Sequence, residues 1–250
     1  QLGGFQKSPV VLRSRQGQSD CKKPSLHGQK NHAVQQCVFS NSYYRNAMLH
    51  LETIEPFTLG LLKSLMEKDY LNPFILVGGT ALALQIGHRK SIDLDMFTMS
   101  DVETDMLLDH LKKDYQVVEK VKTKGALIAE IEGIKTDFIR FKYQFNYPFI
   151  LADGIRLANI ADIVPMKLDA ITGRGDKKDF FDLYYLLDKY DLAQMLRLFS
   201  EMYPHSTLFH VIKSLTWFAD ADPQSPPEVM DEKVTWERVK RRIEKAVTHQ

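Results

Sequence analysis

Hydrophobic residues follow several different spacings in the first half of the chain. Over 51–65 they recur at helical intervals, and the Asn-Pro pair at 72–73 predicts the end of that helix. The short apolar run at 74–77 predicts a buried strand that ends at a glycine pair. A second helix is expected over 80–86, and Gly87 predicts its end.

Residues 91–97 alternate strictly, which predicts a strand with two unlike faces. One face is expected to hold Ile92, Leu94 and Met96. The other is expected to hold Asp93, Asp95 and Phe97. The patterns that follow predict one helix and three strands, at about 101–113, 115–121, 126–132 and 134–142. This part of the chain is therefore predicted to be a domain with a mixed sheet.

The pattern changes beyond residue 158, where only amphipathic helices are predicted. They are expected at about 160–172, 176–189, 191–203, 205–219 and 232–248. A segment with three prolines, 220–228, predicts a loop between the last two. The sequence thus predicts an α+β fold, with a mixed-sheet domain at 48–157 followed by an all-helical domain at 158–250.

Composition is that of an ordinary globular protein, with 44% hydrophobic and 26% charged residues among 250. No apolar run approaches the roughly 18 to 20 residues that a membrane helix needs, and no hydrophobic block begins the chain. We therefore expect a cytoplasmic protein without a membrane partner. The two cysteines, Cys21 and Cys37, lack metal-ligand spacing, which disfavours a structural zinc site.

Charge is distributed unevenly along the chain. Residues 1–47 contain seven basic residues and one aspartate, a charge of +6, so the total of +1 leaves −5 for the remainder. The remainder lacks the basic balance of a general nucleic-acid binder. Residues 1–47 are polar and lack periodicity, and the first methionine is Met48, so we predict a disordered or non-native N-terminal extension.

The two aspartates of the alternating strand are the first candidate for chemistry. Side chains two apart on a strand project to one side about 6.5 to 7 Å apart, so Asp93 and Asp95 can converge on one point. Two carboxylates can hold one or two Mg²⁺ ions, whose other ligands are waters and substrate phosphates. The pair therefore predicts a site for a nucleoside triphosphate (NTP), although an Asp-x-Asp alone also fits a solvated strand face.

A phosphate site is predicted beside them. Gly78 and Gly79 precede a helix, where close backbone approach and free N–H groups suit the β and γ phosphates. Thr80 can cap that helix or donate its hydroxyl to the same phosphates. Arg89 and Ser91 add positive charge and a hydroxyl near the carboxylates. A simple glycine turn is the alternative interpretation.

A third carboxylate is expected on a neighbouring strand, where it would bind metal and take the proton from an attacking hydroxyl. Asp137 lies within the strand-like run 134–141 and is the candidate. The alternative is an exposed or salt-bridged strand residue. With Asp93, Asp95 and Asp137 as metal ligands, nucleoside monophosphate (NMP) would be transferred and pyrophosphate released.

At these residues the sequence resembles the AbiEii/AbiGii toxin family of nucleotidyltransferases. The family pattern is Gly-Gly-Thr/Ser-Ala-Leu, Arg-x-Ser/Thr and Asp-x-Asp, then a helical lysine and Lys/Arg-Asp-Phe/Tyr-x-Asp-Leu. The matching segments here are 78–82, 89–91, 93–95, Lys167 and 178–183. The resemblance covers about 50–250 and leaves 1–47 without a counterpart.

The resemblance implies a DNA polymerase β-like nucleotidyltransferase, encoded as a toxin beside an antitoxin, that transfers NMP to an acceptor such as the 3′ end of tRNA. It also implies that Lys167 contacts the nucleotide phosphates and that Asp182 is an acid of the helical domain near the site. From spacing alone, Asp179 and Asp182 share a helix face, and Lys178 and Asp182 could instead form a surface ion pair.

Two other functions stay open from the sequence. The same fold could modify a protein side chain or a small-molecule hydroxyl. Alternatively, it could be a catalytically silent NTP-binding module, although the presence of both aspartates argues against that.

Overall fold

The computed structural model describes residues 48–249, which belong to one compact unit. The prediction for 1–47 lies outside the described residues. Among the helices of the described part, none is both long enough and apolar enough to cross a bilayer.

Seven strands form a single mixed sheet in the order β3-β4-β5-β2-β1-β7-β6. Their bounds are β1 (Ile75–Leu76), β2 (Leu94–Thr98), β3 (Val117–Thr123), β4 (Ala126–Ile131), β5 (Ile134–Arg140), β6 (Ile150–Ala152) and β7 (Ile155–Leu157). The pairs β2–β5 and β1–β7 are parallel, and the other pairs are antiparallel. The predicted mixed sheet is confirmed.

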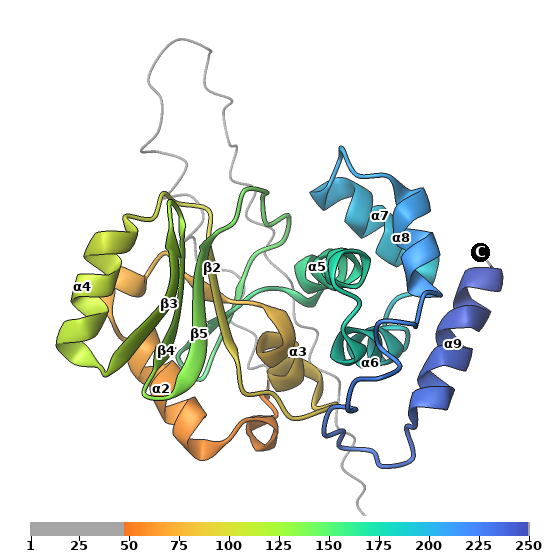
Figure 1. The fold of residues 1–250 in the computed structure, drawn as a ribbon, viewed down its shortest axis with the longest axis horizontal. Helices are drawn as coiled ribbons and strands as arrows, with labels where there is room; N and C mark the ends of the chain where they lie inside the picture. The colour runs from red at the N-terminus through yellow and green to blue at the C-terminus, as the bar shows by residue number, and fades with distance from the viewer. Residues whose placement is uncertain (1–47, 250) are drawn as a thin grey trace, which may run out of the picture. The chain divides into compact units, whose positions relative to one another are not determined.

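Helices cover both faces of the sheet (Figure 1). In the first half they are η1 (Leu51–Thr53), α2 (Pro56–Met66), η2 (Asp69–Leu71), α3 (Gly78–Ile86) and α4 (Thr104–Asp114). In Figure 1, α2 and α4 lie on one side of the sheet and α3 on the other, facing the later helices. The core is continuous from the sheet into those helices.

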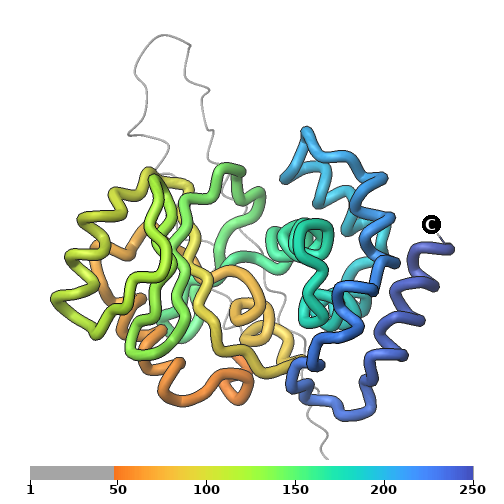
Figure 2. The backbone as a smooth tube through the Cα atoms, in the orientation of Figure 1, coloured from red at the N-terminus to blue at the C-terminus, as the bar shows by residue number. Residues whose placement is uncertain are grey.

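The second half of the described chain is helical, as predicted. Its helices are α5 (Ile160–Gly173), α6 (Lys177–Leu186), α7 (Leu192–Met202), α8 (Leu208–Leu215) and α9 (Trp236–Thr248). Figure 2 shows α5 surrounded by its neighbours, and it contacts α3, α6, α7 and α8. The aromatic residues Phe180, Phe181 and Phe199 are fully buried and fill the space around it.

Several details differ from the sequence prediction. The helix predicted over 51–65 is divided into η1 and α2, because the backbone is extended at Ile54 and Glu55. Helix α3 begins at Gly78, two residues early, so Thr80 lies inside its first turn and Val77 is the N-cap residue. Ile92 precedes β2 and is 61% exposed, so it does not share the buried face of Leu94 and Met96. The strands β6 and β7 were not predicted, because three residues are too few to display a period of two.

Candidate active site

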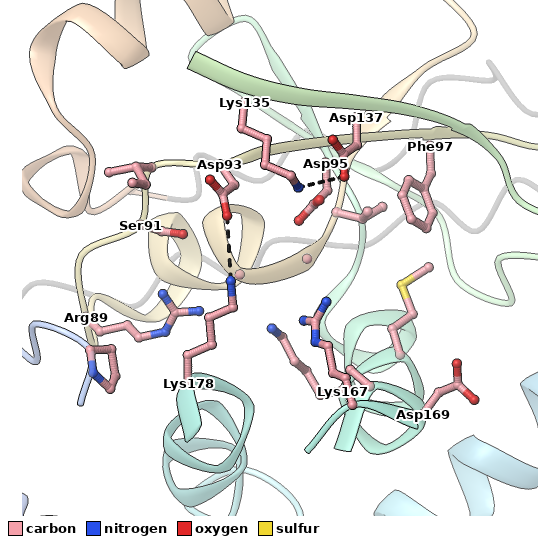
Figure 3. A pocket seen from close by; sticks show the side chains of 18 of the residues that line it. Arg89, Ser91, Asp93, Asp95, Phe97, Lys135, Asp137, Lys167, Asp169 and Lys178 are labelled. Atoms are coloured by element: carbon pink, nitrogen blue, oxygen red, sulfur yellow. Dashed lines mark hydrogen bonds and ion pairs between the residues drawn. The ribbon is translucent and has the colours of Figure 1, made fainter. Parts of the chain in front are cut away.

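Asp95 and Asp137 lie side by side on adjacent parallel strands. They are direct register partners in the β2–β5 pair, and Asp93 comes immediately before β2. All three line one cleft of about 620 Å³ between the sheet and helices α5 and α6. In Figure 3 the three carboxylates lie together on the sheet side, while Lys167 and Lys178 extend toward them from the helices.

The carboxylates are not fully neutralised by nearby cations. Lys135 Nζ lies 2.8 Å from Asp137 Oδ2, and Lys178 Nζ lies 3.6 Å from Asp93 Oδ2. Burial raises the pKa of the Asp95 carboxyl; Asp137 and Asp93 raise it further, while Lys167 and Lys135 act in the opposite direction. Burial and the two neighbouring aspartates therefore disfavour the ionised form of Asp95 more than the nearby cations favour it.

A divalent cation fits these carboxylates. Asp137 Oδ1 is buried and has no hydrogen-bond partner within residues 48–249, and a cation would satisfy it and relieve the repulsion at Asp95. In the described part of the chain, no three His, Cys, Asp or Glu side chains are already grouped as a complete metal site. Carboxylate oxygens are ligands that Mg²⁺ prefers, and waters and substrate oxygens would complete its coordination.

The glycine pair is required by close contacts with charged side chains. Gly78 has φ +67, and a Cβ there would collide with Asp95 Oδ2, while a Cβ on Gly79 would collide with the Arg89 guanidinium. No side chain among the described residues caps α3, so its first-turn N–H groups can serve a ligand. Both glycines line the cleft, which brings this helix start next to the carboxylates.

Thr80 does not cap the helix. Its side chain is buried, and its hydroxyl donates to the Asp93 carbonyl oxygen and shares a hydrogen bond with Ser91 Oγ at 2.8 Å. The hydroxyl is thus committed inside the protein, where it fixes the segment that leads into Asp93. Ser91 lines the cleft.

A second set of charges, which we call the buried charge network, lies behind the cleft. It comprises His88, Arg89, Lys167, Asp179 and Asp182, all less than 5% exposed. Asp182 accepts bonds from His88 Nε2 at 2.7 Å and from Arg89 Nε and Nη2 at 2.6 and 3.0 Å. Lys167 Nζ lies 2.9 Å from Asp179 and 2.5 Å from Asp182.

The network joins the loop before β2 to helices α5 and α6. Although burial alone would raise the pKa of Asp182, Arg89, Lys167 and His88 outweigh it and hold the pKa well below its usual range. Asp179 and Asp182 share a helix face, as their spacing predicted. Lys178 pairs with Asp93 rather than with Asp182, because Asp182 is fully buried.

The loop before β2 is also held by backbone bonds to a distant segment. Lys90 N donates to the Glu228 carbonyl at 2.8 Å, and Met230 N donates to the His88 carbonyl at 3.0 Å. Residues 88–90 thus border the 228–230 segment as a short antiparallel bridge. The proline-containing segment 220–228, which ends at Glu228, was predicted only to be a loop.

Three cleft cations were absent from the predicted site. Lys135 shares a strand face with Asp137, so the period of two could have indicated it. Lys178 and Arg174 also line the cleft, with side chains 42% and 54% exposed. Arg174 pairs with Asp176 and Asp179, which keeps its guanidinium at the edge of the buried charge network.

The sequence and fold are those of a nucleotidyltransferase. The chain belongs to the AbiEii family: residues 60–249 match the family described as "Nucleotidyl transferase AbiEii toxin, Type IV TA system". An uncharacterised protein of Aquifex aeolicus (strain VF5) is 36% identical over 166 residues, which cover 64% of this chain and 81% of that protein.

Two solved structures are also similar. MenT4, a nucleotidyltransferase toxin of Mycobacterium tuberculosis H37Rv, is 16% identical with a TM-score of 0.49, over 78% of this chain and 85% of that one. JHP933 from Helicobacter pylori is 20% identical with a TM-score of 0.43, over 78% of this chain and 94% of that one.

Proposed function

We propose that this protein uses Mg²⁺ to transfer NMP from an NTP to a hydroxyl acceptor. The observation that carries the proposal is the direct pairing of Asp95 with Asp137 on adjacent strands, with one oxygen of Asp137 left without a hydrogen-bond partner within residues 48–249. Asp93, Asp95 and Asp137 would hold the metal, which when bound supplies positive charge to the phosphates. Because the family is one of toxins, we further propose that the transfer is its toxic activity.

The triphosphate would lie at the start of α3. The N–H groups of Gly78 and Gly79 and the Ser91 hydroxyl face the cleft and can donate to phosphate oxygens. Arg89 and Lys167 form ion pairs with Asp182, which hold their side chains in place. They would therefore supply positive charge to the triphosphate from fixed positions. Lys178 would join them, since its weak pairing with Asp93 leaves it partly free.

Asp137 would accept the proton of the acceptor hydroxyl. The acceptor oxygen then forms its bond to the α-phosphorus, and the bond from that phosphorus to the bridging oxygen breaks. Pyrophosphate leaves with the bonding electrons. Asp182 would act as a positioning residue for Arg89 and Lys167. Its buried carboxylate contacts both side chains but does not line the cleft.

We infer from the family that the acceptor is the 3′ end of tRNA and that a cognate antitoxin protein is the partner. Incubating the protein with labelled NTPs, Mg²⁺ and total cell extract tests the acceptor. Label in tRNA supports the inference, whereas label only in protein or in small molecules contradicts it.

The transfer itself is tested with Asp93→Ala and Asp95→Ala. We expect each variant to lose NMP transfer and Mg²⁺-dependent NTP binding, because each removes a metal-binding carboxylate. Asp153→Asn is the control, since Asp153 is a half-exposed acid that pairs with Lys63, and asparagine tolerates its φ of +50. Full activity in either cleft variant would refute the proposal.

A further inference from the structure

The cleft has a second end that the phosphate site does not use. Phe97, Phe141, Met166, Asp169 and Tyr203 line it. In Figure 3, Phe97 and Asp169 lie on one side of Asp95, while Arg89 and Ser91 lie on the other. The carboxylates therefore separate a cationic end from an aromatic one.

The aromatic end offers partly exposed ring surface. The Phe97 and Phe141 ring centroids are 5.7 Å apart with planes tilted by 38°, and both residues are only partly buried. Phe141 packs in turn against Phe145, with centroids 5.2 Å apart, so it is supported from behind. Aromatic faces of this kind bind nucleobases by stacking, whatever the base.

Asp169 adds a polar group to this apolar end. It follows Met166 by one helical turn on α5, so both face the cleft. It is exposed, and within residues 48–249 it makes no hydrogen bond or ion pair. An ionised carboxylate only accepts hydrogen bonds, so a ligand there must supply donors.

We propose that this end is the subsite for the base of the NTP, with Phe97 and Phe141 as the stacking surface and Asp169 as the residue that selects the base. The proposal rests on the proposed function. Adenine, cytosine and guanine each carry an amino group that can donate to Asp169. Uracil has one ring N–H between two carbonyl oxygens, which a carboxylate repels, so UTP is the disfavoured substrate.

The position of the subsite along the strand favours the base of the NTP over a base of the acceptor. Phe97 follows Asp95 by two residues on the same strand face, a step of about 6.5 to 7 Å. A ribose can span that step when the α-phosphate lies at Asp95 and the other phosphates at Gly78–Gly79. The nucleotide would then occupy the cleft from its cationic to its aromatic end.

The test is the affinity of the wild-type protein, Asp169→Asn and Phe141→Leu for ATP, CTP, GTP and UTP with Mg²⁺, by calorimetry. In the wild type we expect UTP to bind about 5- to 150-fold more weakly than the best of the other three. Asp169→Asn should close that gap, because an amide also donates, while Phe141→Leu should weaken all four alike. Asp153→Asn is the control.

The outcomes separate this proposal from the one it rests on. If no NTP binds the wild-type protein, the proposed function fails. If NTPs bind without discrimination against UTP, or if Asp169→Asn keeps the gap, only the base subsite is wrong. If Asp169→Asn and Phe141→Leu alter the KM for RNA and leave NTP binding unchanged, the aromatic end binds the acceptor and the proposal is overturned.

Discussion

Two groups of carboxylates lie close together in this protein and have opposite surroundings. Asp179 and Asp182 are fully buried, and His88, Arg89, Lys167 and Arg174 surround them. Asp95 and Asp137 instead lie beside each other at a cleft. The pKa of Asp182 is held far below its usual range by its cations, whereas burial and two neighbouring aspartates raise the pKa of Asp95.

The surroundings of an aspartate therefore determine whether it stabilises the fold or is available for chemistry. A buried carboxylate whose charge is balanced within the protein stabilises one arrangement of the elements that supply its partners. A carboxylate cluster with excess negative charge retains affinity for a cation from solution. The sequence motifs contain both kinds of aspartate, and only their surroundings distinguish them.

The largest expected effect is on Asp95. We predict that Asp95→Asn lowers kcat/KM for NMP transfer by at least about 1000-fold, near the upper end for loss of one electrostatic partner. Its free energy of unfolding should stay unchanged or rise, because the substitution removes a charge that its surroundings disfavour. Transfer assays and urea unfolding measure the two quantities. If Asp95→Asn instead unfolds the protein, Asp95 has a structural role like that of Asp182, and the proposed difference between the two aspartates is wrong.

Asp182→Ala should act mainly on stability. Removing Asp182 from the buried charge network takes away the carboxylate that pairs with Arg89 and leaves Lys167 with Asp179 alone, at a cost of about 3 to 5 kcal/mol in the free energy of unfolding. The surface variant Asp153→Asn, which keeps a residue type that tolerates the φ of +50 there, should cost no more than about 1 kcal/mol. Equal effects in urea unfolding would contradict the structural role of the network.

Acid should destabilise the protein in two stages. Burial lowers the pKa of His88 below 6.5, and Arg89 and Lys167 lower it too, against the opposing effect of Asp182. Below pH 6.5 the unfolded chain therefore binds a proton that the folded protein excludes, and stability falls by at most about 1.4 kcal/mol per pH unit. His88→Gln should remove this first stage in urea unfolding measured from pH 8 to pH 5.

The second stage begins below pH 3.8, the ordinary pKa of an aspartate, because the folded pKa of Asp182 lies well below it. The unfolded chain again binds the extra proton, so the stability that Asp182 contributes is lost as the pH falls. The stability difference between wild type and Asp182→Ala should therefore shrink in this range. A difference that is constant down to pH 2 would exclude this account.

Lys178 should show the smallest effect. It is 42% exposed and its nitrogen lies 3.6 Å from Asp93, so Lys178→Met should change the free energy of unfolding by no more than about 0.5 kcal/mol. If Lys178 binds phosphate, the KM for NTP should rise by up to about fivefold, in the range of one exposed ion pair. Lys178→Arg is the control that keeps the charge, and steady-state kinetics is the measurement.

Periodicity predicted most of the fold because long elements show their buried face in sequence. The helical half was predicted in the right order, and Leu94 and Met96 are buried on one side of β2 while Asp95 lies at the cleft. β6 and β7 were missed because they are short, and Arg156 holds β7 through bonds to the Phe74, Met66 and Leu71 carbonyls that no local pattern reveals.

The site was predictable where its residues are close in sequence. The positions of Asp93, Asp95 and the glycine pair follow from one strand and one turn. Arg89 and Asp182 are 93 residues apart, so nothing local indicates that each is the other's partner. Whether the individual roles assigned to these residues hold stays a prediction for the experiments above.

The bonds between residues 88–90 and 228–230 bear on how the protein is made. A ribosome adds the glycine pair, Asp93, Asp95 and Asp137 well before it reaches Glu228 and Met230. Until then, the loop that leads into Asp93 lacks its bonds to the Glu228 carbonyl and the Met230 N–H. A growing chain therefore carries the cleft aspartates for much of its synthesis before the loop beside them is fully held.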